Sequence, residues 1–271
     1  MSHANHTHHP DPADQANLVH SRIWEEEAEP DNAFATRRAH CHGYDVYGAM
    51  LGQATWADMI YLMLRGEAPS AIEERLLDTL AMALANPGPR TPSVHAAMCG
   101  GVAGSTAAAS LIAALSVGAG GYSGAREVLL AMQQWSDCGA DLALWQAQLA
   151  AEPDRSVSIW PVQQHAAGFD PHTRSASTIV LQTLHCLAGI SPGPHLPWLL
   201  ANRDAMEAGA GCALGMGAVA AAALHDLGFT PAQGEMLFLM LRLPGAAAHA
   251  LEQGDMGFRK FPFYTIEQEA A

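Results

Sequence analysis

Apolar side chains recur every three or four positions along most of this chain, and the apolar–polar alternation that is typical of strands is almost absent. The clearest segment carries its apolar residues at Ile72, Leu76, Leu77, Leu80 and Leu84. Such spacing gives a helix one apolar stripe, which has to be buried against other helices. The pattern therefore predicts an all-α fold.

Capping residues and helix breakers indicate where the predicted helices begin and end. Thr55 precedes a helix that ends at Gly66, Ser70 starts the next one, and Thr230 starts another near the end of the chain. Further helices are predicted over 21–28, 125–135, 142–149, 175–187, two pieces of 196–223, and 246–253. Non-helical segments are predicted at a turn over 43–45, an extended 156–160, a loop over 165–174, and a break at 243–245.

The stretch from Pro92 to Glu127 is the densest in Ala, Gly and Ser. Small side chains let helix backbones approach closely, which suits a deeply buried helix pair. The Gly-rich elbow at 118–124 then opens another helix, whose first N–H groups are suited to an anionic group. A packed helix pair with a flexible turn is the alternative interpretation.

Composition limits the kind of protein this is. The 271 residues are 49% hydrophobic and 15% charged, and 27 acidic against 13 basic residues give a net charge of −14. This charge argues against a surface for nucleic acid or for an anionic membrane. The apolar content is enough for a large core and suggests a buried subunit interface.

We expect a cytoplasmic protein without a membrane span or a signal peptide, since no uninterrupted 18-residue apolar run and no charged leader is found. Five scattered cysteines without CxxC spacing indicate free thiols in a reducing compartment. Residues 1–20 are rich in His and Pro and are predicted to be a disordered tail. No metal site is expected, because nothing near these histidines supplies a fixed geometry.

Three segments, in this order, resemble the citrate synthase superfamily, and within it the short citrate synthase-like and citryl-CoA lyase-like members. They are GYDVYGAMLGQATWADMIYLMLRGEAPS from Gly43, NPGPRTPSVHAAMCGG from Asn86, and LHDLGFTPAQGEMLFLMLRLPGAAAHALEQ from Leu224. The resemblance covers most of residues 37–265. It implies an all-helical homodimer in which a small domain, 122–205, closes on a large domain, 21–121 with 206–271.

The resemblance implies a Claisen condensation of an acyl-CoA with a keto acid, or its reverse. In that chemistry a carboxylate removes the acyl-CoA proton, one histidine hydrogen-bonds the enol oxygen, and a second polarises the keto acid carbonyl. The first histidine belongs to an HGGAxE pattern, and here Tyr122 or Ser123 stands in its place. The aspartate of an NxDG pattern corresponds to Gly217, and the next carboxylate along the chain is Asp226.

The second histidine belongs to a GFGHxxH…DPR loop, which corresponds to HAAGFDPHTR here. Gly168-Phe169 match, His172 follows one residue late, and Arg174 stands for the arginine of the loop. Asp170 with His172 would form an acid–base pair on this loop. We therefore predict Tyr122, Ser123, Asp170 and His172 as the catalytic candidates.

The arginines of such enzymes hold substrate carboxylates. Arg242 and His249 match the arginine and the histidine of a GRTPGxxAH pattern, and Arg259 or Lys260 would serve as a later arginine. A buried helix histidine is the alternative interpretation of His249. With Arg174, these residues are the predicted substrate-binding set, and no covalently bound cofactor is expected, because the CoA thioester would be a substrate.

Three functional hypotheses follow from this match. The first is an acyl-CoA condensing enzyme or citryl-CoA lyase-like enzyme with altered catalytic groups. The second is a non-catalytic citrate synthase-like subunit or ligand-binding module that has lost the catalytic His and Asp. The third is a different reaction in a pocket reshaped by Trp160, Phe169 and Tyr122. Whether the chain is an enzyme stays open at this point.

Overall fold

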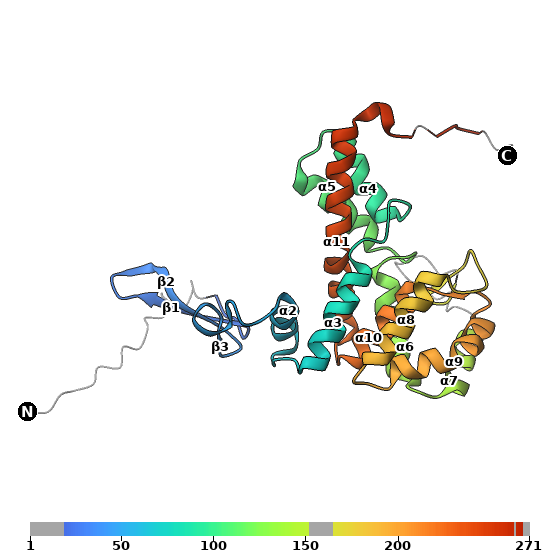
Figure 1. The fold of residues 1–271 in the computed structure, drawn as a ribbon, viewed down its shortest axis with the longest axis horizontal. Helices are drawn as coiled ribbons and strands as arrows, with labels where there is room; N and C mark the ends of the chain where they lie inside the picture. Colours follow the sequence, from blue (N-terminus) through green and yellow to red (C-terminus); the bar gives the residue numbers. More distant parts are fainter. Residues whose placement is uncertain (1–18, 152–164, 263, 268–271) are drawn as a thin grey trace, which may run out of the picture. The chain divides into compact units, whose positions relative to one another are not determined.

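The structure, a computed structural model, describes residues 19–151, 165–262 and 264–267. It consists of two compact units, of which the first ends at Ala68 and the second begins at Pro69 (Figure 1). The predicted tail up to residue 18 and the 156–160 segment lie outside the described residues. The division into domains at residues 122 and 206 stays a prediction.

The first unit begins with a β-hairpin, so the helix predicted over 21–28 is wrong. Strand β1 (Trp24–Glu29) pairs antiparallel with β2 (Asn32–Cys41), and β2 pairs with β3 (Tyr44–Asp45). Three successive glutamates favour a helix locally, but cross-strand pairing overrides that preference. One side-chain contact across the two strands is the hydrogen bond that Arg37 of β2 donates to Glu27 of β1 at 2.9 Å.

The turn predicted over 43–45 is displaced toward the N-terminus. It lies at His42–Gly43, where His42 has a φ of 47° and Gly43 a φ of 85°. A π-helix (Val46–Met50) follows β3, and helix α2 (Trp56–Arg65) completes the first unit. As predicted, Thr55 caps α2 and Gly66 ends it in the left-handed conformation.

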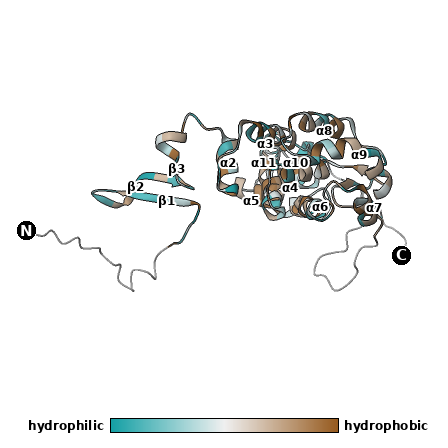
Figure 2. Ribbon diagram, turned by 90° about the horizontal axis from the view of Figure 1, so that it is seen from below, coloured by the Kyte–Doolittle hydropathy of each residue, from teal (hydrophilic) through white to brown (hydrophobic). Residues whose placement is uncertain are grey.

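The second unit is almost entirely helical, which confirms the predicted all-α class. Its elements are α3 (Ala71–Leu84), α4 (Pro92–Val102), α5 (Ala107–Gly118), α6 (Ala125–Cys138), α7 (Leu142–Ala150), β4 (Phe169–Asp170), α8 (Thr178–Ile190), α9 (His195–Ala210), β5 (Ala213–Leu214), α10 (Met216–Asp226), α11 (Pro231–Met256) and a 3₁₀ turn (Phe258–Lys260). Figure 2 shows that hydrophobic residues gather in these helices, whereas β1 and β2 are mainly hydrophilic.

Two layers of helices meet along α11. This helix packs against α4 and α5 through small side chains and, with α10, against α6. A Cβ on Gly101 of α4 would come within 3.2 Å of the Cα of Ala250 on α11, closer than such atoms pack. The small-residue stretch is thus a close-packing device, as its composition predicted.

Two predicted boundaries in the second unit are wrong for identifiable reasons. Helix α11 continues through Pro244, where a break was expected, and the Gly245 N–H that follows the proline is satisfied by the Ala85 carbonyl at 2.7 Å. Helix α8 begins at Thr178 and not at residue 175, since the Ala176 N–H is taken by the Glu207 carboxylate at 2.9 Å. In both places a long-range hydrogen bond satisfies a backbone N–H at the point where the local pattern misleads.

Within the described ranges, none of the helices combines the length and the apolar character that a bilayer crossing requires.

Candidate active site

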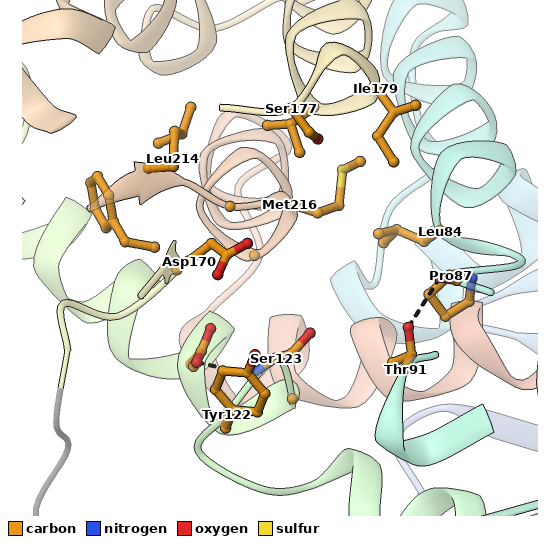
Figure 3. Close-up of a pocket in the computed structure, with 18 of the residues that line it drawn as sticks. Leu84, Pro87, Thr91, Tyr122, Ser123, Asp170, Ser177, Ile179, Leu214 and Met216 are labelled. Atoms are coloured by element: carbon orange, nitrogen blue, oxygen red, sulfur yellow. Dashed lines mark hydrogen bonds between the residues drawn. The ribbon is translucent and has the colours of Figure 1, made fainter. Parts of the chain in front are cut away.

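A cavity of about 340 Å³ opens in the second unit, between the elbow before α6 and the segments that lead into α8 and α10. One wall is polar and contains Tyr122, Ser123, Glu127, Asp170 and Arg242. Apolar side chains line the cavity as well, and one of them, Phe238, lies beside Arg242; the others are Leu84, Ile179, Val180, Leu214 and Met216. Figure 3 shows Tyr122 and Ser123 facing Ser177 and Ile179 across this space.

The backbone of Ser123 hydrogen-bonds to both buried charged groups of the polar wall, Glu127 and Arg242. Its backbone N–H donates to Glu127 Oε1 at 3.0 Å, and its carbonyl accepts from Arg242 Nη1 at 2.7 Å. Its φ of 51° is unusual for a residue with a side chain, and such backbone strain is concentrated at functional sites. The anion at the elbow, which the sequence only suggested, is the protein's own Glu127 carboxylate.

Glu127 is a carboxylate that pairs with a distant histidine. It lies in the first turn of α6 with 4% of its surface exposed, and His165 Nε2 lies 2.7 Å from its Oε1. Burial raises the pKa of Glu127, although the N–H groups of Ser123 and Gly168 and the His165 ring act in the opposite direction. The carboxyl group therefore holds a proton more readily than an exposed glutamate.

Arg242 faces the same cavity from α11. Burial lowers the pKa of Arg242 to about 10 against the opposing effect of Glu127, so the guanidinium remains charged at neutral pH. It lies over the Phe238 ring at 4.7 Å, which fixes its plane. A buried, oriented guanidinium of this kind is suited to a carboxylate ligand.

The loop that carries Asp170 is pinned to the start of α10. Gly168 has a φ of 84°, and a Cβ there would lie 2.7 Å from the Ala218 nitrogen, so only glycine fits. Phe169 and Asp170 then pair with Leu214 and Ala213. This places Asp170 at the cavity, while its Oδ1 accepts from the His172 N–H at 2.9 Å.

Tyr122 lies between two histidines. Its ring packs edge-on against His165 at 6.0 Å and against His172 at 5.6 Å between centroids. Partial burial, together with the Asp170 and Glu127 carboxylates, raises the pKa of Tyr122. The phenol is therefore a hydrogen-bond donor at neutral pH.

The structure brings some predicted site residues to the cavity and leaves others away from it. Tyr122, Ser123, Asp170 and Arg242 line it. The remaining predicted residues do not line it: His172, Arg174, His249 and Arg259. His172 and Arg174 are exposed on the loop after Asp170, and Arg259 lies over Phe258, 5.9 Å from its ring. His249 is half-buried beside Asn86, a cavity residue, with Nε2 3.2 Å from Oδ1.

Two residues of the site, Glu127 and His165, were missed by sequence reasoning. Glu127 carries two usable signals: it stands at the Glu of the HGGAxE pattern, and it lies four positions before the buried Ala131, on the same helix face. It also lies near Gly217, since a Cβ there would be 3.6 Å from Glu127 Oε2. His165 carries no local signal, because its partner is 38 residues away.

Among the described side chains, no group of three or more His, Cys, Asp or Glu residues is arranged to hold a metal ion.

Solved structures with the same architecture have TM-scores of 0.58 to 0.68. Citryl-CoA lyase from Hydrogenobacter thermophilus matches 94% of this chain and 97% of its own, with a TM-score of 0.65 and 18% identity. The fold is citrate synthase-like. The predicted fold class is therefore confirmed at the level of the fold family.

Two other matches are longer than this chain. ATP citrate lyase from Methanothrix soehngenii, in complex with citrate and coenzyme A, matches 99% of this chain over 46% of its own, with a TM-score of 0.68 and 15% identity. Citrate synthase from Thermoplasma acidophilum, with carboxymethyl coenzyme A and oxaloacetate, matches 80% over 58% (TM-score 0.58, 16% identity). Neither the protein-family models nor the curated proteins gave a match.

Proposed function

We propose that this chain binds an acyl-CoA and a carboxylate substrate in the cavity and makes or breaks the carbon–carbon bond between them, as a citrate synthase or citryl-CoA lyase does. The observation that carries the proposal is the polar wall. The Ser123 backbone bonds to a buried guanidinium and to a buried carboxylate at one cavity, whose lining also includes apolar side chains. A dicarboxylate needs the first charge, and proton transfer at carbon needs an acid–base group such as the second.

Each cavity residue has a role in this proposal. Arg242 binds a substrate carboxylate, and its buried position keeps water from competing for the guanidinium. Tyr122 donates a hydrogen bond to the thioester oxygen as it gains charge in the enolate. Asp170, which accepts from the backbone N–H of His172, faces the hydroxyl or carbonyl of the second substrate. No covalently bound cofactor is required.

The non-catalytic alternative predicts ligand binding without turnover. Calorimetry with CoA, citrate and oxaloacetate measures binding, and cleavage of citryl-CoA to acetyl-CoA and oxaloacetate measures turnover. We expect both. Binding without cleavage or condensation would favour the non-catalytic reading, and absence of binding would contradict both.

The loop pair is tested by His172→Ala. If the His172 ring, which packs edge-on against Tyr122, takes part in the reaction, turnover falls at least tenfold, although the variant keeps the backbone N–H that donates to Asp170. Turnover equal to that of the wild type would remove His172 from the mechanism. The matched control is His185→Ala. His185 is an exposed histidine of α8 whose ring hydrogen-bonds to the Leu181 carbonyl of its own helix.

We further propose that the chain works as a cytoplasmic homodimer or with a partner subunit. Exposed apolar side chains on α5 and α11 support a subunit contact; they are Ile112, Val117, Met236, Met240 and Leu251. Light scattering coupled to gel filtration gives the mass directly, and a mass of one chain, about 28.6 kDa, would contradict the dimer.

A further inference from the structure

We propose that Glu127 is a catalytic acid–base residue of this cavity, which takes the proton from the carbon next to the thioester carbonyl and returns it in the reverse direction. The inference rests on the proposed function and adds the group that moves the proton. Within the described lining of the cavity, the carboxylates are Glu127 and Asp170. Of the two, Glu127 is the one that the protein buries and orients.

Two hydrogen bonds fix the Oε1 atom of Glu127. Its Oε1 is held by the Ser123 N–H at 3.0 Å and by His165 Nε2 at 2.7 Å. Its Oε2 lies near Gly217, a cavity residue, where a Cβ would stand 3.6 Å from this oxygen. A carboxylate held through one oxygen keeps the other aimed, as proton transfer to carbon requires.

The surroundings of Glu127 set its basicity. The ionisable groups around it are His165, Arg242, Tyr122, Asp170 and Cys212. Burial outweighs the groups that favour the anion, and it raises the pKa of Glu127. A base whose pKa lies closer to neutral pH is a stronger acceptor for a weakly acidic carbon proton.

The step balances within the groups named. Glu127 Oε2 forms an O–H bond with the proton as the C–H bond breaks. The electron pair of that bond becomes the carbon–carbon double bond of the enolate, and the thioester oxygen takes the negative charge and the hydrogen bond from Tyr122. In cleavage, the enolate carbon takes the proton back from Glu127 as the C=C pair re-forms the C–H bond.

Asp170 fits this role less well. Its Oδ1 accepts from the His172 N–H at 2.9 Å, a local turn bond that fixes its own loop. The loop around it is exposed at Pro171 and His172. Glu127, by contrast, lies beneath the elbow and is shielded from competing water.

Exchange of the thioester α-protons with solvent isolates this step. Wild-type protein is incubated in D₂O with acetyl-CoA and with malate as a non-reacting dicarboxylate, and loss of the methyl signal is followed by NMR. We expect Glu127→Gln to slow exchange by about 10²–10⁴-fold while acetyl-CoA binds with an affinity within threefold of the wild type. The matched control is Asp204→Asn, a carboxylate outside the cavity lining whose side chain is 87% exposed. It should keep the exchange.

A second variant guards against a merely structural effect. Gly217 has an ordinary φ, and a Cβ there meets Gly168 Cα at 3.4 Å and Glu127 Oε2 at 3.6 Å, which is normal contact. Gly217→Asp in the Glu127→Gln background should therefore restore a carboxylate to the same place and recover at least tenfold of the lost exchange. Gly217→Asn in that background should recover none.

The outcomes separate the two proposals. Exchange in Glu127→Gln within threefold of the wild type overturns the role of Glu127 and leaves the proposed function standing. Recovery by Gly217→Asn equal to that by Gly217→Asp overturns it as well. A wild-type protein that binds acetyl-CoA but exchanges no protons contradicts the proposed function itself.

Discussion

Asp226 and Glu127 are both buried carboxylates of the second unit, but their pKa values are shifted in opposite directions. Asp226 at the end of α10 has a side chain with no exposed surface, and Glu127 has one that is 5% exposed. Burial raises the pKa of each, yet the pKa of Asp226 lies below its ordinary value and that of Glu127 lies above it. Burial therefore does not account for the difference.

The difference comes from the hydrogen bonds. Asp226 accepts four: from the Ser191 hydroxyl at 2.7 Å, from the His195 N–H at 2.9 Å, from His195 Nδ1 at 2.6 Å and from the Leu196 N–H at 2.9 Å. These bonds join the start of α9 to the end of α10. Both Oδ atoms are used, so Asp226 contributes to stability and has no oxygen left for a ligand.

The cluster around Asp226 is also closed off by rings. His195 packs on Trp135 at 5.0 Å and on His225 at 4.3 Å between ring centroids. Burial and the neighbouring His195 lower the pKa of His225, so this ring stays neutral near pH 7. The comparison suggests that a buried carboxylate in this fold has a structural role when its oxygens are saturated and a chemical role when they are not.

The largest effect on stability is expected for Asp226→Ala. It leaves the Ser191 hydroxyl, the His195 ring and two backbone N–H groups without their acceptor, and breaking such a buried network costs about 3–5 kcal/mol. Urea unfolding measures the loss, with the exposed Asp204→Ala as control. A loss below 1 kcal/mol would mean that the cluster is not structural.

Arg242→Lys should have the next largest effect, and it should act on binding. The lysine cannot stack on Phe238 and donate to the Ser123 carbonyl as the guanidinium does, so citrate should bind about 10- to 150-fold more weakly, the loss of one hydrogen bond to a charged group. Calorimetry with citrate measures it, and the exposed Arg75→Lys is the control. Unchanged affinity would place the substrate carboxylate elsewhere.

The contributions of Asp226 and Glu127 to stability should change with pH in opposite directions. The folded-state pKa of Asp226 is depressed, so its stabilisation is present above about pH 3.9 and is lost as pH falls through the folded-state pKa. The pKa of Glu127 is raised, so its contribution is present below about pH 4.3 and is lost as pH rises through the folded-state pKa.

Unfolding free energies of the wild type, Asp226→Asn and Glu127→Gln between pH 3 and 8 test this assignment of signs. Asp226→Asn should lose most at neutral pH, and its difference from the wild type should shrink as the solution becomes acidic. The unfolding free energy of Glu127→Gln should increase relative to that of the wild type as pH rises above about 4.3. Curves that stay parallel across this range would contradict both shifts.

The smallest effect is expected at an exposed carboxylate. Glu27 in the hairpin pairs with Arg37 at 2.9 Å, with side chains that are 39% and 50% exposed. Such surface pairs contribute about 0.2–1 kcal/mol, so Glu27→Gln should lower the unfolding free energy by less than 1 kcal/mol. A larger loss in urea unfolding would show that exposure does not weaken carboxylate pairing in this protein.

The fold could be predicted where the signal is local. Thr55, Ser70 and Thr230 cap α2, α3 and α11 as predicted, because a capping side chain bonds to an N–H three residues away. The hairpin of β1 and β2 was not predicted. Its stability depends on pairing between the two strands, and the glutamate-rich sequence of β1 gives no local signal of that pairing.

The site was predicted less completely, for a related reason. The resemblance predicted Tyr122, Ser123 and Arg242 as site residues, and all three line the cavity, because short sequence patterns locate them at the elbow and on α11. The contacts that give the cavity its chemistry join distant residues: Glu127 with His165 across 38 residues, and Arg242 with Ser123 across 119. No local spacing encodes such pairs.

The central claim is that this cavity moves a proton and a carbon–carbon bond of an acyl-CoA. A crystal structure with oxaloacetate and a thioether analogue of acetyl-CoA tests it most directly. We predict that the carbon next to the analogue's carbonyl lies about 3–3.5 Å from Glu127 Oε2, with an oxaloacetate carboxylate on Arg242. Ligands bound away from the Ser123 wall, or a reacting carbon closer to Asp170 than to Glu127, would contradict it.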